Sequence, residues 1–491
     1  MNDASAFDTG TDAPAGPLTV GRWAGTVFVV LFLMSLLDWI DRWTLAGVLT
    51  ALQADLKIED AAAGSLNSFF LVTYCIVSPF MGYLGDRSQR TRLLALGVGV
   101  WSLATIGTGL AHNLTELRIA RSLLGIGEAT YGVIAPSLLM DLFTRRGRAR
   151  VLSAYYLAMP LGYAIGIKLG GYVVDTTGNW RLAFFLVGAP GLFAAIAALF
   201  LPEPVRGLSE GYDPERLKRD QRVGATAADY RDLLVNSSYT YTLMGLAAYT
   251  FAFGGFAYWL PSYLERVRGI PRQDVGNVVA LTGFAAALIG MLAGGWIADH
   301  LARKTPNALF FVSGASMLLA VPCILAALFA SSTWAIVIWL FLAQALMFAN
   351  TGPSNAVIAN VVLPKMRATA YAIGTLTVHM LGDVWSPWLM GLVSDMFGKG
   401  AWMGTPPGEF LAMLGFVPVE FQGGRTNLGA GMLVVVPAVA LGGVVLLLGM
   451  RHLPREMALM QSRLKAELAR QASVESRSGD SASGSGAAPQ S

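Results

Sequence analysis

Three charged residues stand late in the first long apolar run of the sequence, in the stretch LLDWIDRWTL. They are Asp38, Asp41 and Arg42, and a later apolar run carries Arg121 and Glu128. A charged side chain that faces lipid deep in a bilayer costs several kcal/mol, so such groups normally face a cavity or each other. Carboxyl groups there can take up and release protons, and guanidinium groups can bind a carboxylate or phosphate. These residue types predict proton transfer and anion binding inside a membrane protein.

The expected depths of these residues are consistent with one common site. At about 1.5 Å per residue, Asp41 lies roughly 13 Å inward of Thr50, and Arg121 lies about 9 Å inward of Thr115 at the same side of the membrane. Glu128 follows Arg121 on one helix face and lies ~10 Å deeper. We therefore expect an ionic cluster that faces a water-filled cavity, in which Arg121 and Glu128 are partners.

Each charge in this cluster receives an expected role. Asp41 and Glu128 are the predicted proton-coupling residues, and Arg121 is the predicted anion site. Arg42 is a predicted substrate-binding residue. It follows Asp41 directly, and because consecutive helix positions diverge by about 100°, one of the two needs a partner on another helix. Asp38 is either part of this chemistry or a structural group bonded to the backbone or a neighbouring helix.

Further polar residues extend the predicted substrate site. Lys168 is either a cavity cation or a side chain that snorkels to the membrane surface. His379 and Asp383 are four positions apart, which predicts a hydrogen-bonded pair on one helix face, with packing as its favoured role. Two groups of residues are expected to line the cavity, a polar one and an aromatic one. They are Tyr155, Tyr156, Asn350, Thr351, Ser354 and Asn355, and Phe251, Phe253, Phe256, Tyr258 and Trp259.

The composition indicates which elements position these residues. Of 491 residues 54% are hydrophobic and only 13% are charged, and the mean hydropathy is +0.54. A chain with so little polar surface is a polytopic membrane protein. The first twenty residues are acidic and lack the basic n-region of a signal peptide, so the first helix is expected to stay. Cys75 and Cys323 lie in apolar runs, so we expect free thiols.

We expect twelve membrane-spanning helices of about 20 or more residues. They are expected at residues 23–50, 63–85, 93–111, 115–143, 149–174, 180–202, 238–263, 275–299, 306–330, 334–363, 367–396 and 428–450. The expected domains are a cytoplasmic segment 1–22, a six-helix bundle 23–202, a cytoplasmic linker 203–237, a second six-helix bundle 238–450, and 451–491. The last of these is read as a cytoplasmic helix near 455–471 and a disordered tail from about Ser473.

Basic residues collect in alternate connections, as in the run from Arg87 to Arg92. By the positive-inside rule these connections and both termini are cytoplasmic, which suits a multi-pass protein of the plasma (inner) membrane. Arg266, Arg268 and Arg272 stand in an opposite connection and are an exception to the rule.

An internal repeat indicates two homologous halves. GYLGDRSQR, from Gly82 to Arg90, ends the second helix, and GGWIADHLARK ends the eighth, with Gly82 and Gly295 separated by 213 positions. The predicted fold is all-α, with twelve transmembrane helices in two pseudo-symmetric six-helix bundles. The expected conformational latch lies at the cytoplasmic end of these helices, where the two glycines before Asp86 let helices approach closely. Its residues are Gly82, Asp86, Arg87, Arg90 and Asp299.

These stretches also resemble a known family. The Gly-x-Leu-x-Asp-Arg loop resembles the signature loop of the major facilitator superfamily, and its second copy keeps Gly295, Asp299 and Arg303. RSLLGIGEA and GYAIGIKLGG look like further family signatures, although Ile167 stands where the antiporter pattern usually has proline. IDRWTLAGVL and HMLGDVWSPWLMGLVSD most resemble the Spinster-like branch, which is associated with sphingosine 1-phosphate and lysophospholipids. The resemblance spans residues 20–450 and implies a transporter fold.

Four function classes are weighed on the residues. An ATP-driven pump needs a GxxxxGK[ST] loop, which the sequence lacks. An enzyme needs a nucleophile with its base or a metal cluster, and the four histidines are scattered, so neither enzyme, metal nor cofactor is expected. A channel or scramblase stays open. The favoured function is a monomeric, proton-coupled secondary transporter of a lipid-like anion, with an exporter of small drugs or organic anions as the alternative. Dispersed basic residues do not suggest nucleic acid.

Overall fold

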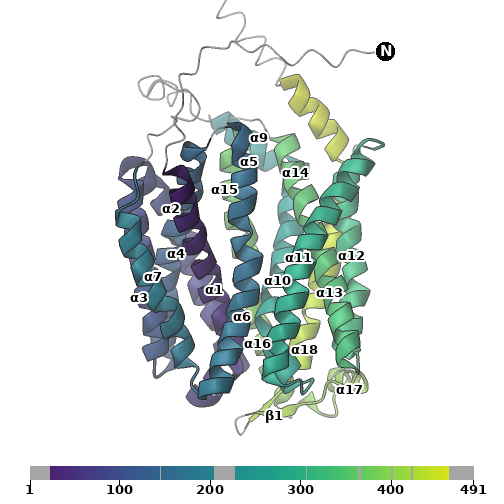
Figure 1. Cartoon of the computed structure of the whole chain (residues 1–491). Coiled ribbons are helices and arrows are strands. Elements are labelled where there is room, and N and C mark those ends of the chain that lie inside the picture. Colours follow the sequence, from purple (N-terminus) through teal and green to yellow (C-terminus); the bar gives the residue numbers. More distant parts are fainter. Residues whose placement is uncertain are drawn as a thin grey trace, which may run out of the picture.

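The computed structural model describes residues 23–143, 145–203, 227–305, 307–362, 366–399, 402–421 and 424–463. In these ranges long helices run side by side and almost parallel (Figure 1). One face, called the terminal face below, carries the start of α1, the short helix α9 (Ala227–Val235) and a helix at 453–463. The opposite loop face carries α17 (Pro406–Met413) and a hairpin of β1 (Val419–Phe421) and β2 (Gly424–Thr426).

The helices before residue 203 form six spans within the described residues, one of them in two pieces. They are α1 (Ala24–Leu56), α2 (Asp60–Arg87), α3 (Arg90–Leu110), α4 (Leu114–Leu142), α5 (Arg145–Tyr156) with α6 (Ala158–Thr177), and α7 (Arg181–Leu199). Their ends lie within a few residues of the predicted ones, because runs of apolar residues and the turns between them determine where a span starts and stops.

The second half contributes six further spans, three of them in two pieces. They are α10 (Ser237–Arg266), α11 (Arg272–Ala302), α12 (Ala308–Phe329), α13 (Thr333–Ala349) with α14 (Thr351–Val361), α15 (Arg367–Leu381) with α16 (Ser386–Gly398), and α18 (Leu428–Leu433) with α19 (Val435–Gly449). Eleven of the twelve are long and apolar enough to cross a membrane as single segments. The exception is α15–α16, whose helix is interrupted between Leu381 and Ser386.

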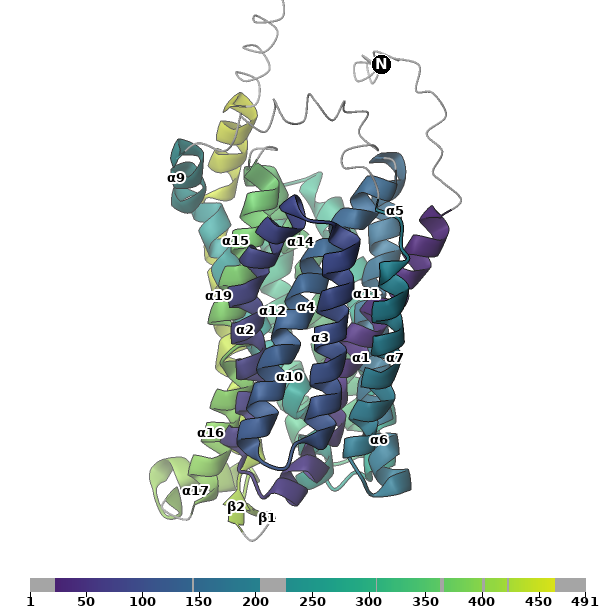
Figure 2. The ribbon, with the colours of Figure 1, turned by 90° about the vertical axis from the view of Figure 1, so that its left-hand side faces the viewer.

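Each set of six spans packs mainly on itself, as Figures 1 and 2 show. Within the first set, α6 fits closely on α1 through glycines spaced four apart. A Cβ on Gly162 would lie 2.3 Å from the Cβ of Trp39, and one on Gly166 would lie 2.5 Å from the carbonyl oxygen of Ile40. The glycine-rich stretch GYAIGIKLGG therefore serves close helix packing. The two sets meet most extensively where α2 contacts α16 and α6 contacts α11.

Several elements differ from the sequence-based expectations. The predicted linker contains α9, and the predicted surface helix is seen at 453–463. The small unit of α17 and the hairpin between α16 and α18 was not anticipated. Residues 1–22 and the tail from Ser473 lie outside the described residues. Cys75 and Cys323 are both buried and free, as expected.

Candidate functional site

The charged residues of α1 and α4 meet between the two helices. Nη2 of Arg42 lies 2.5 Å from Oε2 of Glu128, and the Glu128 side chain is fully buried while that of Arg42 is 18% exposed. The buried carboxyl of Asp38 interacts electrostatically with the carboxyl of Glu128. Two adjacent buried carboxyl groups repel each other unless one of them carries a proton. This part of the site therefore joins one guanidinium to two carboxyl groups.

The expected pairing of Arg121 with Glu128 is wrong. Among the described residues Glu128 is paired with Arg42, which reaches it from α1. Arg121 and Glu128 are seven residues apart on α4, a separation of about 10 Å along the axis. That distance is too long for a direct ion pair, whereas a side chain on the neighbouring helix can face Glu128 at its own level.

Arg121 forms a second part of the site with Asp41, nearer to the loop face. Both are buried and interact electrostatically, in agreement with their predicted similar depth. Oδ2 of Asp41 accepts a hydrogen bond from the hydroxyl of Thr105 on α3. The Arg121 guanidinium lies 5.7 Å from the ring centroid of Phe184.

Several buried polar atoms in the cluster have no hydrogen-bond partner among the described residues. They are Oδ1 of Asp38, Oδ1 of Asp41, Nε of Arg42, Nε and Nη2 of Arg121, and Oε1 of Glu128. A buried polar atom without a partner is costly, so such atoms concentrate where a ligand, a proton or another conformation supplies the partner. The cluster is thus the least satisfied region of the membrane interior that the structure describes.

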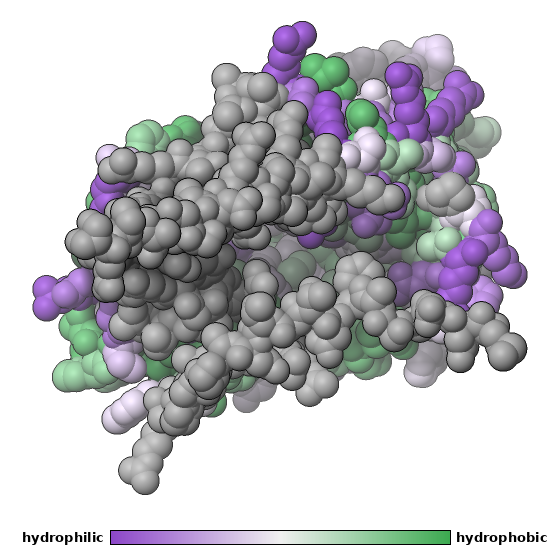
Figure 3. All heavy atoms as spheres, turned by 90° about the horizontal axis from the view of Figure 1, so that it is seen from above, coloured by the Kyte–Doolittle hydropathy of each residue, from purple (hydrophilic) through white to green (hydrophobic). Residues whose placement is uncertain are grey.

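A cavity of about 500 Å³ lies beside the cluster, in the half of the molecule nearer to the terminal face. It is bounded by the middle of α2, by α4 and by α15, and most of its lining is apolar. Its polar groups include Tyr74, Ser78, Thr375 and His379. Figure 3 looks onto the terminal face, where hydrophilic and hydrophobic residues lie side by side. The cavity can hold a molecule with a long apolar part.

Arg42 is the arginine of the cluster that lies against the cavity wall. Its guanidinium is 4.5 Å from the ring centroid of Trp39, 4.8 Å from that of Phe70 and 5.7 Å from that of Tyr74, which lines the cavity. Aromatic rings hold a guanidinium in place while they leave its edge free for an anion. Arg121 is 2% exposed and belongs to the part of the site nearer to the loop face.

The predicted His379–Asp383 hydrogen bond is confirmed, with 2.8 Å between Nδ1 and Oδ1. His379 lines the cavity, and Asp383 lies in the interruption between α15 and α16. The interruption is joined to the other set of helices, because Asn67 donates to the carbonyl oxygen of Asp383 at 3.0 Å and Ser68 donates to that of Val384. The pair therefore sits where the cavity ends and the two sets of helices touch.

Other predicted substrate residues lie elsewhere. The buried hydroxyl of Tyr155 donates to Tyr131 at 2.9 Å, and Tyr156 is exposed at the end of α5. The buried side chain of Asn350 donates to the carbonyl oxygen of Met347 at 2.5 Å, at the junction of α13 and α14. Tyr156 and Asn350 thus stand at helix interruptions, where polar groups can satisfy freed backbone atoms. Lys168 is exposed on α6, and none of these four side chains lines the cavity.

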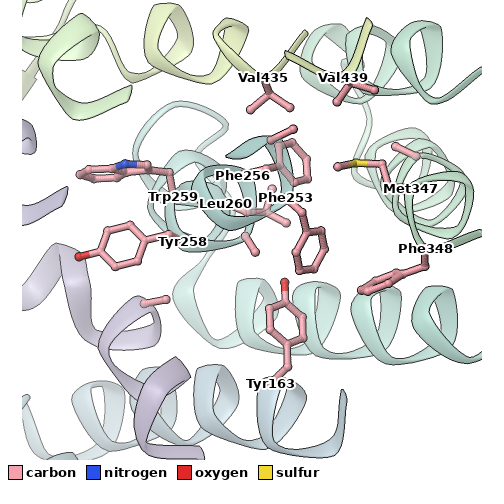
Figure 4. Packing of buried hydrophobic residues seen from close by; sticks show 14 of the residues in the cluster. Tyr163, Phe253, Phe256, Tyr258, Trp259, Leu260, Met347, Phe348, Val435 and Val439 are labelled. Atoms are coloured by element: carbon pink, nitrogen blue, oxygen red, sulfur yellow. The ribbon is translucent and has the colours of Figure 1, made fainter. Parts of the chain in front are cut away.

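Most of the aromatic residues that were predicted to line the cavity lie in the hydrophobic core instead. Phe253, Phe256, Tyr258 and Trp259 are buried in the hydrophobic core around α10, as Figure 4 shows. The prediction of a cavity lining is therefore wrong for these four residues, because aromatic side chains of this size gain most by packing in a buried cluster.

The predicted latch residues lie at the terminal face. Arg90 is bound within the first set of helices, to Asp141 at 2.6 Å and to Glu203 at 3.0 Å. Arg87 lies over the ring of Tyr83 at 3.6 Å, and Asp299 is exposed. The side chain of Asp86 lies outside the described residues.

The close helix approach expected at the latch glycines is not found. A Cβ on Gly82 would meet Val133 at 3.7 Å, which is an ordinary contact. The physical reason is that Gly82 lines the cavity, so α2 has no close neighbour on that side.

Sequence reasoning missed Thr105 and Tyr74, which are single polar residues in apolar runs and carry no signal of their own. It also gave no role to Arg266, although the position of this arginine against the positive-inside rule was a usable signal.

Comparisons with known proteins agree with this geometry. Residues 31–387 match the model of the Major Facilitator Superfamily. Protein spinster homolog 1 of Xenopus tropicalis is 31% identical over 401 residues, which cover 77% of this chain and 74% of that protein. The sphingosine-1-phosphate transporter SPNS2 of Danio rerio is 33% identical over 390 residues, 74% of this chain and 75% of that protein.

A similar fold is seen in a solved structure of a bacterial homolog to the human lysosomal transporter Spinster, in an inward-facing and unoccupied conformation. The TM-score is 0.77 at 22% identity, and the likeness covers 89% of this chain and 98% of that chain. At this identity the comparison concerns the fold alone.

Proposed function

Because the chain belongs to the major facilitator superfamily, and within it to the Spinster-like branch, we propose that it is a proton-coupled secondary transporter of an amphipathic anion. The proposed substrate class is a lysophospholipid or a phosphorylated sphingoid base. The proposal concerns the coupling ion and the substrate, and the following observations support it.

The charge balance of the cluster carries the proton proposal. Asp38, Asp41 and Glu128 place three carboxyl groups beside the two guanidinium groups of Arg42 and Arg121, and all five residues lie on α1 and α4 inside the membrane. A net charge in this surrounding is costly. The cluster is neutral when one proton is shared among the three carboxyl groups, and the neighbouring carboxyl groups of Asp38 and Glu128 are where a shared proton relieves the most repulsion.

Anion binding at Arg42 would change this balance. A phosphate that reaches the guanidinium competes with Glu128, and a released carboxylate next to Asp38 takes up a proton because two adjacent carboxylates repel each other. Binding of the substrate and of the proton would then be linked. This linkage needs no cofactor. Arg121 and Asp41, the other charged pair of the cluster, neutralise each other throughout.

The cavity supports the amphipathic character of the substrate. Its apolar walls on α2, α4 and α15 suit a hydrocarbon chain, while Arg42, Tyr74 and His379 lie at one end for a polar head. Pockets for small molecules are commonly 300–1,000 Å³ and mainly apolar, with a few placed polar groups. A sphingosine-1-phosphate transporter among the relatives agrees with this substrate class.

We further place the terminal face in the cytoplasm and the protein in the plasma (inner) membrane. The basic run from Arg87 to Arg92 lies at the terminal face, in keeping with the positive-inside rule. With this orientation the cavity belongs to an inward-facing state, and the latch at Arg90 would bridge the two sets of helices only in the outward-facing state.

The test is substrate-dependent proton movement in liposomes that contain the full chain and a pH-sensitive dye inside. Addition of a lysophospholipid or sphingosine 1-phosphate should change the internal pH, and an imposed pH gradient should drive accumulation of the lipid. Organic anions and drugs without a long chain, tested in the same way, represent the alternative substrate class. Lipid transport without proton movement would contradict the coupling, and movement of the short anions alone would contradict the substrate class.

A further inference from the structure

Basic residues collect at the loop face, against the charge distribution of the rest of the chain. Two of them, Arg266 and Arg272, form ion pairs there. The positive-inside rule does not explain arginines at this face, so we examine the contacts that they make within the protein.

Arg266, at the end of α10, binds Asp60, the first residue of α2. Nη1 of Arg266 lies 2.8 Å from Oδ1 of Asp60, and Nη2 lies 3.2 Å from Oδ2. The two side chains are only 5% and 0% exposed. The pair thus joins the first set of helices to the second through a bidentate, buried ion pair, which is the strongest geometry for these groups.

The remaining polar atoms of this pair are also satisfied. Oδ2 of Asp60 accepts from the hydroxyl of Ser394 on α16 at 2.6 Å, and Oδ1 accepts from Gln53 at 2.8 Å. Nη2 of Arg266 donates to the hydroxyl of Thr426 at 2.5 Å. A buried ion pair is stable only when such additional hydrogen bonds are present.

A second carboxylate also links the two sets, but this one belongs to the second set and binds backbone groups of the first. Oδ1 of Asp395, on α16, accepts from the backbone N–H of Asp60 at 3.1 Å, and Oδ2 accepts from that of Ala61 at 2.7 Å. A helix of the second set therefore supplies the negative charge that caps the N-terminus of α2 in the first. The backbones come close enough that a Cβ on Gly391 would lie 2.3 Å from the carbonyl oxygen of Asp60.

A second contact between the sets lies deeper in the membrane, about 16 Å inward of the start of α11, and is made by an aromatic side chain. Tyr163 of α6 reaches into the second set, where Figure 4 shows its hydroxyl pointing toward Phe253 and Phe348. A Cβ on Gly283 of α11 would lie 2.2 Å from the Tyr163 ring. Its buried hydroxyl has no hydrogen-bond partner within the described ranges. Arg272 adds a partly exposed contact to Asp175 at 3.7 Å.

We propose that Asp60, Arg266 and Asp395 are the lock that holds this transporter closed at its loop face, and that Tyr163 is a plug between α6 and α11 deeper in the membrane. Access from that face requires the two sets of helices to separate there, which breaks the Arg266–Asp60 ion pair and both hydrogen bonds accepted by Asp395. The proposal rests on the two-bundle transporter fold and requires neither proton coupling nor a lipid substrate.

The test measures the separation of the sets at the loop face in the full chain, reconstituted in lipid nanodiscs without substrate. Cys75 and Cys323 are replaced by alanine, and spin labels are placed on exposed positions of the two sets, Ala54 and Gln273. Arg266→Gln and Asp395→Asn should each raise the ratio of long to short distances at least about tenfold, because each leaves a buried group of the lock without its charged partner.

Glu59→Gln is the matched control. Its carboxylate also bridges the two sets at this face, to Lys399 at 3.3 Å, but both side chains are 64% exposed, and exposed pairs contribute little. Its distances should equal those of the parent. Asp395→Asn keeps the shape of the side chain. If Arg266→Gln does not fold, the distances in Asp395→Asn therefore test the lock on their own. Parent-like distances in a folded Asp395→Asn protein would overturn the proposal.

Discussion

The lock at the loop face and the charged cluster inside the membrane use the same residue types, but they differ in how well their polar atoms are satisfied. In the lock, Asp60 and Arg266 bind each other and further neighbours from both sets of helices. In the cluster, Asp41, Arg121 and Glu128 each retain a buried polar atom without a partner among the described residues.

This difference separates two uses of buried charge. A satisfied network favours one arrangement of its helices, because every alternative leaves charges unpaired. An unsatisfied cluster is sensitive to anything that supplies a missing partner, such as a proton or an anion. The lock is thus suited to hold a conformation and the cluster is suited to respond to ligands, and the following variants test that division.

The largest effect is expected for Arg42→Ala. It removes the arginine at the cavity wall and leaves Asp38 and Glu128 side by side without their cation. Binding of a phosphorylated lysolipid should weaken at least about thirtyfold, equivalent to ~2 kcal/mol, which is typical for the loss of one partner of a buried pair. Tryptophan fluorescence titration in detergent measures the affinity.

Arg121→Ala is the matched variant for Arg42→Ala. On sequence grounds it was the expected anion site, but its guanidinium is buried beside Asp41. Its binding affinity should stay near that of the parent while substrate-dependent proton movement is lost. If Arg121→Ala weakens binding more than Arg42→Ala, the assignment of the anion site to Arg42 is wrong.

The charge balance predicts a second group of variants. Asp38→Asn, Asp41→Asn and Glu128→Gln each leave two carboxylates with two guanidiniums, so the cluster is neutral without a bound proton. Each should exchange substrate across liposomes while proton movement falls to background. The pH-sensitive dye and labelled-substrate exchange measure the two quantities on one preparation. Wild-type proton movement in one of these variants would show that the substituted carboxyl group does not share the transported proton.

A smaller effect is expected at the plug. Gly283→Ala places a methyl group 2.2 Å from the Tyr163 ring, and overpacking of this kind costs about 1–3 kcal/mol. The ratio of open to closed loop-face distances should rise about tenfold by the spin-label measurement. Gly276→Ala on the same helix is the control, since its nearest atom would be the Cα of Lys168 at 3.4 Å. If the spin-label distances are the same in both variants, Tyr163 does not help to hold the loop face closed.

The sequence was sufficient for the spans but not for their contacts. Hydropathy placed all twelve spans, since insertion into lipid depends on local composition. The interruption between Leu381 and Ser386 was not predicted, although Gly382, Asp383 and Pro387 in this stretch were usable signals of a break in the helix. The choice of Arg42 over Arg121 as partner of Glu128 depends on the rotation of α1 against α4. Such rotations follow from packing with every neighbour and leave no local pattern.

The smallest effect is expected at the terminal face, where Glu203 tests whether charge pairs outside the membrane take part in pH sensing. Burial would raise the pKa of its carboxyl, but hydrogen bonds from the Thr91 N–H and from Arg90 outweigh burial and hold the pKa below its usual range. A lowered pKa in the folded protein stabilises it above the unfolded value of about 4.3, and this stability is lost as the pH falls through the folded pKa.

Glu203→Gln should therefore lower Tm by roughly 1–2 °C, because the pair is partly exposed. This difference should stay constant between pH 8 and about pH 5.5 and shrink only in stronger acid, where the parent loses the same charge. Differential scanning fluorimetry across this range measures it. The pH response of transport should be unchanged in this variant, in contrast to the variants of Asp38, Asp41 and Glu128. A shifted pH response would show that proton sensing extends beyond the membrane cluster.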